Sequence, residues 1–453
     1  MEMFRRNPVL AGVLAVVAVA AAACGAAPGG SSGSASPASA KAGSASATAA
    51  QQAAAALGID LSKCTTDPTT PLGSSVNVGE TLALTGGPAT AYIPLGEGIK
   101  AAFDEFNATS GLPTKFNLIQ ADDQFAPDKA LTATQQLVEQ DDVVAMTSTI
   151  GTAEVAAVRP LLNTACVPMI AGLAGGAASD DPSAYPWTLT YSLPSAVDAR
   201  IWAESIQQKY PGGAKVAMFY SDDESGQDFY AAVQHYLAGT KSKIVSTQTI
   251  EDTDSAAPAS QVTAMRSSGA NVLVAAPTGA ACTTLMDEVA AQGWTPTFYM
   301  SSVCPTILFD LAGKAANGVY LDQYNMDPLR PPYNTNPAVK AAVAAIKKYA
   351  PGTPISNTSL AGYGYAEPFF AAVKAAAASP LGLSRLGLLQ AATHLTFQPA
   401  LTIPGVNYSL NYPAQEVAME AAELTQYNAS SKTFTYVKLY SFRGQMTGIA
   451  STR

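Results

Sequence analysis

The chain has 453 residues, 25 of them basic and 34 acidic, and its formal net charge at pH 7 is −9. This acidic balance lacks the clustered Lys and Arg that a nucleic-acid surface requires, so we expect no nucleic-acid partner. Beyond the N-terminal region no stretch is long and apolar enough to span a bilayer, and roughly 390 residues remain, enough for two lobes with cores of their own.

The N-terminus has the layout of a secretory signal. Arg5 and Arg6 form a basic head, and residues 8–23 form an uncharged apolar stretch, shorter than the roughly 20 residues of a membrane-spanning helix. The Ala-Ala-Ala-Cys sequence at 21–24 resembles a bacterial lipobox, whose cysteine is lipidated and becomes the first mature residue, although Ala21 stands where Leu is usual. We predict a signal peptide over 1–23 and lipidation of Cys24. The alternative is ordinary secretion with an incidental cysteine.

The segment that follows, residues 24–56, is rich in Gly, Ser, Ala and Pro and has almost no large apolar side chain. It therefore has too little apolar surface to offset the entropy cost of ordering. We predict a disordered tether. A flexible chain of about thirty residues spans about 30 Å, which is enough to hold a domain just off a membrane surface.

Four cysteines follow the tether, namely Cys64, Cys166, Cys282 and Cys304. An even number in an exported chain indicates two disulfides, and four cysteines allow three pairings. We favour Cys64–Cys166 together with Cys282–Cys304, because each bond then stays within one lobe.

Beyond the tether, short β-rich apolar runs alternate with amphipathic helical stretches. Ile99, Phe103 and Phe106, for example, share one helical face. This alternation predicts βαβ units, parallel sheets and an α/β fold. The predicted strands are Thr81–Leu84, Phe116–Gln120, Val143–Ser148, Val167–Ala171, Thr188–Ser192, Val216–Tyr220, Val272–Ala276, Thr297–Ser301 and Val319–Gln323.

Ligands of parallel sheets bind beyond the carboxyl ends of the strands, and here small, polar or aromatic residues follow the strands. Such loops occur at 85–92, 122–127, 148–152 and 221–228. Gly151 and Thr152, at the start of a helix, could present backbone N–H groups and a hydroxyl to an anion such as a carboxylate. Thr152 could equally do no more than cap its helix, and the sequence leaves both interpretations open.

The order and spacing of several motifs resemble type I periplasmic solute-binding proteins of ABC importers, of the branched-chain amino acid/amide type. The resemblance extends from about Val76 to Phe442. It implies a two-lobed type I periplasmic-binding-protein fold, each lobe a parallel-sheet α/β sandwich, with three crossover strands between them. The motifs are Gly87-Pro88 with Tyr92, Asp122-Asp123 with Pro127, Val167-Pro168-Met169-Ile170, Val216–Tyr220 followed by Ser225-Gly226, and Gly362–Tyr365.

The resemblance also implies boundaries for the lobes. We expect the first lobe to comprise residues 57–195 and 326–400, and the second lobe to comprise 196–325 and 401–453. The three crossings are expected near Leu193–Asp198, Tyr324–Pro328 and Phe397–Pro404.

In the first lobe, the resemblance assigns ligand contacts to three loops. A hydroxyl residue at the start of the helix after the third strand holds the ligand carboxylate in the family, and Thr152 stands there, preceded by Ile150 and Gly151. The loop after the fourth strand is Leu173-Ala-Gly175, without the family's usual Thr. Tyr92 matches an aromatic wall of the family's pocket, and Tyr363, in the last motif, completes the first-lobe set.

In the second lobe the chain departs from the family. Ser225 and Thr278 stand where aromatic residues are usual, and Ser302 stands where an acid pairs with the ligand's ammonium. Enclosing an ammonium without that carboxylate costs about 3–5 kcal/mol. The acids at 222–224 could substitute for it, or could form a solvated loop. We therefore expect the ligand to be a carboxylate or a neutral polar compound, aromatic or amide-bearing, rather than leucine.

These predictions indicate an extracytoplasmic substrate-binding lipoprotein. It would trap a small solute that is amino-acid-like, a carboxylate or an amide, and deliver it to ABC transporter permease subunits. We expect it to be monomeric, free of cofactors and metals, and lipid-anchored at the outer face of the cell membrane, or periplasmic. One alternative is a ligand-sensing lobe that serves a separate receptor.

A tethered secreted hydrolase is the other alternative, and the sequence disfavours it. His235 lies on the polar side of its helix, and His394 has no Ser or Cys partner in a recognisable motif. The adjacent acids at 122–123 and 141–142 are typical of turn and cap groups rather than of a catalytic pair. With these two histidines and no CxxC spacing, no zinc site is expected.

Overall fold

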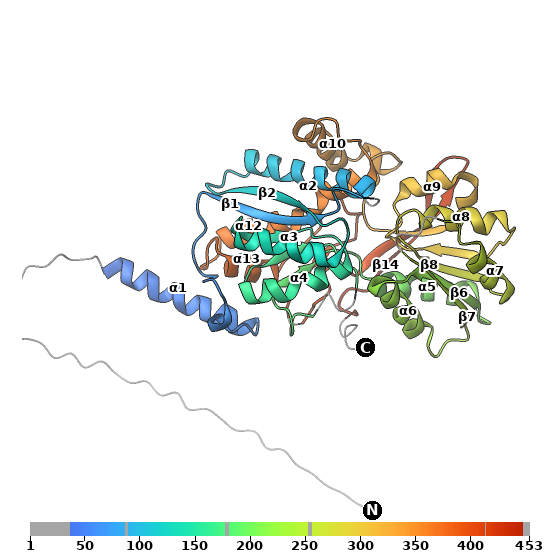
Figure 1. Cartoon of the computed structure of the whole chain (residues 1–453), viewed down its shortest axis with the longest axis horizontal. Coiled ribbons are helices and arrows are strands. Elements are labelled where there is room, and N and C mark those ends of the chain that lie inside the picture. Colours follow the sequence, from blue (N-terminus) through green and yellow to red (C-terminus); the bar gives the residue numbers. More distant parts are fainter. Residues whose placement is uncertain (1–36, 87–88, 177–180, 252–255, 413, 447–453) are drawn as a thin grey trace, which may run out of the picture. The chain divides into compact units, whose positions relative to one another are not determined.

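The computed structural model describes residues 37–86, 89–176, 181–251, 256–412 and 414–446. Residues from Ala45 onward form one unit, in which two β-sheets are each flanked by helices (Figure 1). The helices are α1 Pro37–Ala56, α2 Ala89–Thr109, α3 Pro127–Glu139, α4 Thr152–Ala165, α5 Ser195–Lys209, α6 Glu224–Leu237, α7 Ala259–Ser267, α8 Ala281–Ala291, α9 Thr306–Ala312, α10 Pro337–Tyr349, α11 Asn357–Tyr365, α12 Glu367–Ala377 and α13 Arg385–Ala392.

The first sheet is entirely parallel, with strand order β2-β1-β3-β4-β5. Helices α3 and α4 pack together on it, while α2 packs on β2 and α12 on β4 (Figure 1). Its strands are β1 Ser75–Leu82, β2 Lys115–Asp122, β3 Val143–Thr147, β4 Met169–Gly172 and β5 Thr188–Thr190.

Aromatic rings attach the C-terminal helices to this first sheet. Phe106 of α2 stacks on Phe370 of α12 with ring centroids 4.2 Å apart, and Phe116 of β2 meets Phe369 edge-on at 5.7 Å. Each such pair contributes about 0.5–1.5 kcal/mol beyond its burial. Segments more than 200 residues apart in the chain thus share one core.

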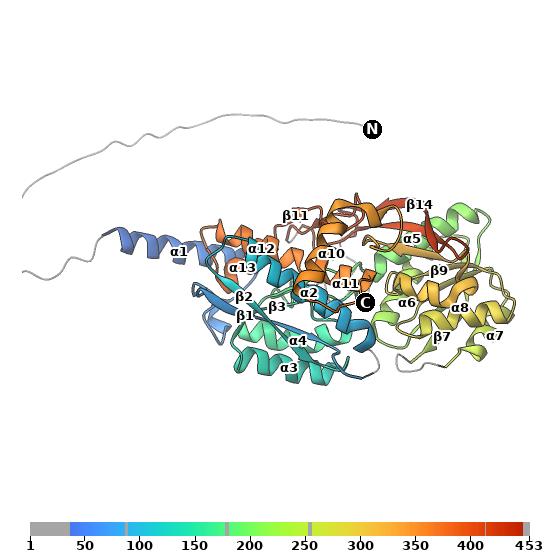
Figure 2. The same cartoon turned by 90° about the horizontal axis from the view of Figure 1, so that it is seen from above.

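The second sheet has strand order β14-β13-β10-β9-β8-β6-β7. Strands β6 to β10 run parallel, and the last two strands add an antiparallel edge. Helices α5 and α6 pack together, as do α7 and α8, which lie side by side in both views (Figure 1, Figure 2). The strands are β6 Lys215–Ser221, β7 Lys243–Ile250, β8 Val272–Ala276, β9 Thr297–Met300, β10 Tyr320–Gln323, β13 Ala421–Asn428 and β14 Thr433–Ser441.

The predicted strands are confirmed as elements, with shifted ends. The first begins at Ser75 rather than Thr81, because its outer half alternates polar and apolar residues and lacks a continuous apolar run. Strands β7, β13 and β14 were not predicted. β7 and β14 have several half-buried or exposed positions, so their sequences carry only a weak apolar signal. β13 is buried along most of its length, but polar residues interrupt its apolar run.

The chain passes between the two sheets in three places. After β5 it enters α5, after β10 it returns toward the first sheet, and after α13 it leads to the last two strands. The second and third passages run side by side: Ile403 N donates to Tyr324 O over 2.8 Å, and Met326 N donates to Leu401 O over 2.9 Å. A two-stranded sheet of β11 (Thr396–Phe397) and β12 (Tyr408–Ser409) lies on the third passage.

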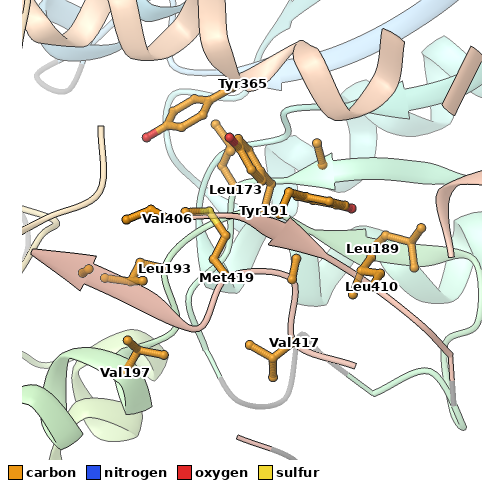
Figure 3. Close-up of a cluster of buried hydrophobic side chains, with 14 of the residues drawn as sticks. Leu173, Leu189, Tyr191, Leu193, Val197, Tyr365, Val406, Leu410, Val417 and Met419 are labelled. Atoms are coloured by element: carbon orange, nitrogen blue, oxygen red, sulfur yellow. The ribbon is translucent and has the colours of Figure 1, made fainter. Parts of the chain in front are cut away.

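A buried hydrophobic cluster surrounds these passages (Figure 3). Tyr191, just before α5, meets the rings of Tyr365 and Tyr408 with centroids 5.6 and 5.4 Å apart. The hydroxyls of Tyr324 and Tyr365 are hydrogen-bonded over 2.7 Å. Side chains from all three passages therefore pack into one core, which fixes where each passage enters and leaves its sheet.

Both predicted disulfides are present, Cys64–Cys166 and Cys282–Cys304. Cys166 ends α4 in a left-handed conformation with a φ of 51°, so the first bond ties the segment before β1 to the end of α4. The second bond joins α8 to the loop after β9.

The predicted tether requires a correction. Its second part, Pro37–Ala56, is helix α1, and Ala50 and Ala54 are buried against the hydrophobic core. Alanine has the highest helix propensity of all residues, so an Ala-rich segment can form a helix without large apolar side chains. Residues 1–36, which hold the predicted signal peptide and Cys24, lie outside the described part of the chain. No helix within that part is long and apolar enough to cross a membrane.

Candidate functional site

Five predicted site residues of the first lobe lie in the loops after β3 and β4 and at the start of α4, at the carboxyl edge of the sheet. The loop after β3 turns sharply into α4, with positive φ angles of 52° at Ser148 and 111° at Gly151. Main-chain bonds hold this turn: Gly151 N donates to Leu173 O over 3.1 Å, and Leu173 N donates to Thr149 O over 2.8 Å. The Gly151 N–H is thus already bonded within the protein. The N–H groups available to a ligand are those that begin α4, from Thr152 onward.

Gly151 also lies under a buried carboxylate. A Cβ at this position would be 1.9 Å from Oε2 of Glu154 and 3.1 Å from the ring of Phe125, and the φ of 111° would strain any other residue here. Glu154 is in the first turn of α4 and 2% exposed, and a helix N-terminus favours a carboxylate there. Phe125 in turn stacks on Tyr92 of α2 with centroids 5.2 Å apart. Gly151, Glu154, Phe125 and Tyr92 therefore form one wall.

Thr152 lies where the two lobes meet. A Cβ on Gly176, in the loop after β4, would be 2.5 Å from the methyl carbon of Thr152 and 2.6 Å from Oδ2 of Asp228. Asp228 belongs to α6 of the second lobe, and both side chains are buried. The absence of a side chain at Gly176 allows the threonine of one lobe and the carboxylate of the other to approach the same point.

The remaining first-lobe residues support this wall from behind. Ile150 and Leu173 pair through an isolated β-bridge and are buried in the core, and Leu173 belongs to the cluster of Figure 3. The carbonyl oxygen of Gly175 accepts bonds from Ser195 N and Oγ, at 3.0 and 3.1 Å. Because Ser195 begins α5, this contact ties the loop after β4 to the first passage between the sheets.

In the second lobe, the loop before α6 is held by its own caps. Asp223 accepts a bond from Gly226 N over 2.7 Å, and Asp222 is exposed. Ser225 is half-buried in the first turn of α6. Thr278, after β8, bonds to Ser221 at the end of β6 through both its N–H and its hydroxyl, at 3.1 Å each. The structure thus favours a capping role for the acidic loop at 222–224.

Ser302 lies directly against a buried carboxylate that comes from another element. Oδ2 of Asp198, in α5, accepts bonds from Ser301 Oγ at 2.7 Å, Ser302 Oγ at 3.1 Å and Ser302 N at 3.3 Å. Burial raises the pKa of Asp198 to about 7, against the lowering effect of these bonds. Burial, reinforced by Asp198, also raises the pKa of Asp322 on β10. Asp198 therefore places a carboxyl group beside Ser302, the position at which an acid was expected from the family and a serine is found.

The Cys282–Cys304 disulfide braces the two loops of this region. Its sulfur atoms both lie 3.5 Å from the carbonyl oxygen of Pro277, which precedes Thr278. Cys304 follows Ser302 by two residues. The disulfide consequently holds the loop after β8 and the loop after β9 together. It thereby also fixes the predicted site residues of these loops, Thr278 and Ser302, relative to each other.

Comparison with known proteins identifies the family. A family model described as "Periplasmic binding protein" matches residues 75–429. The chain belongs to the periplasmic binding protein family. A possible leucine/isoleucine/valine-binding protein from Rhodopirellula baltica is 21% identical, with 82% of this chain and 98% of that chain covered and a TM-score of 0.67. No match is found among the curated proteins.

Two further solved structures share the fold. A branched-chain amino acid ABC transporter protein from Thermus thermophilus, solved with bound valine, is 16% identical over 82% of this chain and 98% of its own, with a TM-score of 0.72. A solute-binding protein from R. palustris, in complex with 4-hydroxybenzoate, is 18% identical over 81% and 97%, with a TM-score of 0.68. The chain has the two-lobed type I fold of these periplasmic binding proteins, a family of transporter substrate-binding proteins.

One predicted residue of this periplasmic binding protein does not join the others. The Tyr363 hydroxyl donates to Glu105 of α2, thirteen residues beyond Tyr92, which is about 20 Å along a helix at 1.5 Å per residue. It packs with α2 and α10 instead. Its neighbour Tyr365 faces the passages between the sheets through its bond to Tyr324. Tyr363 and Tyr365 therefore have different neighbours, and Tyr363 lies away from the other predicted site residues.

Four acidic or aromatic residues of the site were not predicted: Phe125, Glu154, Asp198 and Asp228. Phe125 and Asp228 lie in loops that the sequence analysis singled out, and Glu154 lies one turn into α4. Asp198 ends a predicted crossing, so its position was named but its role was not. Among the residues that the structure describes, no group of three or more His, Cys, Asp or Glu side chains could hold a metal ion.

Proposed function

We propose that this periplasmic binding protein traps a small solute between its two lobes and delivers it to the permease subunits of an ABC importer. The observation that carries the proposal is the approach of Thr152 and Asp228 to the same glycine, Gly176. It joins the predicted ligand position of the first lobe to a helix at the carboxyl edge of the second sheet, where ligands of such sheets bind. A lipid on Cys24 would keep the protein, as a monomer, at the outer face of the membrane beside its permease.

The proposed solute is amino-acid-like, a carboxylate or an amide, and the charges of the site favour an amide. Glu154 and Asp228 place carboxylate oxygens at the start of α4. A solute carboxylate would bring a further negative charge close to these oxygen atoms. An amide N–H can donate a hydrogen bond to the same oxygen atoms. This refines the expectation from sequence, in which a carboxylate and a neutral compound were equivalent.

The contacts of Ser302 support the same solute class. Its hydroxyl proton points to Asp198 Oδ2, so the hydroxyl oxygen is left as an acceptor for any group that approaches the loop after β9. A solute donor, such as an amide N–H, therefore has an acceptor in each lobe: Asp228 beside Thr152, and Ser302 backed by Asp198.

The test is a thermal-shift screen of the purified protein against valine, valinamide, isobutyrate and isobutyramide. A ligand that binds only the folded state stabilises it by about 2.7 kcal/mol at a hundredfold excess over Kd. We expect an amide to raise the melting temperature more than its parent acid does. D228N should narrow that preference, and D222N, an exposed acid of the same loop, should leave it unchanged. If the wild type, D228N and D222N all showed the same order of melting-temperature shifts among the four solutes, the proposed amide preference would be contradicted. If no solute raised the melting temperature, the proposal that the protein traps a solute of this kind would be contradicted.

A further inference from the structure

A cavity of about 150 Å³ lies in the second lobe, and none of the predicted solute-binding residues lines it. That volume corresponds to roughly five water molecules at about 30 Å³ each. It opens on the face of the second sheet opposite α5: Asp322 faces Trp202 of α5, and side chains alternate along a strand, so Gln323 faces the cavity. The lining residues are Gln323, Asp327, Arg330, Pro331, Pro332, Tyr333, Glu423, Thr425, Phe434 and Tyr436.

The polar side chains of this cavity are almost completely buried. Gln323, Asp327, Arg330, Glu423 and Thr425 are between 4% and 8% exposed. Buried charges are stable only when they are paired or hydrogen-bonded. The hydrogen-bond partners within the protein therefore show which polar groups of the cavity are already bonded and which remain available to a bound ligand.

Arg330 is fully engaged by the protein. A guanidinium has five N–H groups, and five hydrogen bonds are formed. Its Nε donates to Lys432 O at 3.1 Å, one terminal nitrogen donates to Asp327 and to Thr306 Oγ1, and the other donates to Asp310 at 2.5 Å and to Thr306 O at 3.5 Å. Arg330 thus has no donor left for an anionic guest.

Glu423 is only half satisfied. Its Oε2 accepts a bond from the Tyr333 hydroxyl at 2.9 Å. Its Oε1 has no hydrogen-bond partner among the described residues. This oxygen is not fully buried, so it remains accessible from the cavity. The same holds for the side-chain oxygen of Gln323, whose amide nitrogen donates to Thr425. The cavity therefore presents two acceptor oxygens, one of them on a carboxylate.

The charge around the cavity is negative. Among the residues that line the cavity, Arg330 carries the one cationic side chain. It pairs with Asp327 and with Asp310 beside the cavity, and Glu423 adds a further carboxylate to the lining. Burial raises the pKa of Glu423, and the bond from Tyr333 opposes that rise. A cation beside Oε1 would complete the hydrogen bonding of this carboxylate and offset its burial.

Aromatic rings form the rest of the wall. Tyr333, Phe434 and Tyr436 line the cavity, and Tyr436 is 59% exposed at its mouth. Aromatic faces attract cations, more strongly when water is excluded. Arg330 already lies 5.5 Å from the centre of the Phe434 ring, which shows that this wall accommodates a positive charge.

We propose that this cavity binds an alkylammonium or guanidinium group. Its N–H groups donate to Glu423 Oε1 and Gln323 Oε1, and its alkyl stem lies between the Tyr333 and Tyr436 rings. Such a group can belong to a free amine or to a Lys or Arg side chain of a protein partner. The site is independent of the proposed solute site, since the two share no residue.

The test is isothermal titration calorimetry of the intact protein with propylammonium and methylguanidinium at pH 7.5 and low salt, with propionate as the anionic control. We expect saturable binding of a cation and none of propionate. E423Q keeps the shape of the side chain and removes its charge, so it should weaken binding about tenfold or more, the loss of one hydrogen bond to a charged group. E251Q, an exposed acid, and D228N, in the solute site, should have no effect.

Y436A provides a second variant at an exposed position, where folding is least at risk, and it should also weaken binding. Affinity should fall on acidification, because burial raises the pKa of Glu423 and protonation removes the charge that attracts the cation. Peptides such as Gly-Arg-Gly distinguish the source: tighter binding of the peptide indicates a protein partner, and tighter binding of the free cation indicates a small amine. Three results would overturn the proposal. They are the absence of saturable binding of a cation or the peptide, equal binding of propionate, and unchanged affinities in both E423Q and Y436A.

Discussion

Glu80 on β1 is a carboxyl group enclosed in the first lobe. It is 0% exposed, and one oxygen accepts a bond from Gln120 at 2.9 Å while the other is buried without a hydrogen-bond partner. Burial raises its pKa from 4.5 to about 8, with a smaller contribution from the charge of Asp123. The folded protein therefore holds this proton over a pH range in which the unfolded chain releases it.

The sign and size of the effect follow from that difference. Because the unfolded chain loses the proton above pH 4.5 and the folded protein keeps it to about 8, stability falls as pH rises between these values. At 1.36 kcal/mol per pH unit, the cost between pH 5 and pH 8 is about 3 kcal/mol, allowing for partial ionisation of the folded form near pH 8. E80Q mimics the protonated acid and does not titrate. It should match the wild type near pH 4 and exceed its stability by about 4 kcal/mol at pH 8.

Urea unfolding followed by circular dichroism at pH 5, 6.5 and 8 measures this difference. E139Q, at the exposed end of α3, serves as the matched control and should show the same pH dependence as the wild type. The reasoning fails if the stability difference between E80Q and the wild type does not grow with pH. It fails equally if E139Q reproduces the effect.

Three further outcomes are expected. C282S should lower the unfolding free energy by about 3 kcal/mol, because the disulfide to Cys304 closes a loop of about 22 residues; equal melting temperatures with and without reductant in the wild type would contradict this. G151A should cost more stability than G293A, since both glycines have positive φ but only Gly151 has a carboxylate and a ring in the space of a Cβ; differential scanning calorimetry compares them. R330M should lose about 3–5 kcal/mol in urea unfolding, because two carboxylates lose their buried partner, and a loss below 1 kcal/mol would show that water replaces the guanidinium.

The sequence predicted those parts of the fold whose signal is local. Strands such as Val272–Ala276 are buried along their whole length, so each is visible as a continuous apolar run. The antiparallel edge was invisible for the opposite reason: β14 has exposed positions along most of its length, and only pairing with β13 shows that it belongs to the sheet. The whole of α1 was missed because composition alone does not distinguish an Ala-rich helix from an Ala-rich tether.

The site was predictable where a motif marks a strand end, and unpredictable where distant elements meet. Thr152 and Gly151 follow directly from the end of β3. Asp198, in contrast, precedes Ser302 by 104 residues, and only the packing of α5 on the second sheet brings the two together. Tyr363 and Tyr365 differ by two positions on one helix, which is enough to point them to different neighbours.

The proposed preference for an amide rests on the placement of the acids rather than on their number. From sequence, the serine at 302 argued that an ammonium would lack its partner, which left a free carboxylate as an acceptable ligand. In the folded protein, Asp198 supplies an acid behind that serine, and Asp228 brings a second acid to Thr152, where the family holds a carboxylate. Both changes add an acceptor: Asp228 adds one where the solute was expected to place a carboxylate, and Asp198 adds one behind the serine that stands where an acid was expected. A solute that donates hydrogen bonds at both ends satisfies this arrangement, whereas a free acid meets like charge at the start of α4. If D228N came to favour isobutyrate over isobutyramide, that reversal would show that one carboxylate sets the preference.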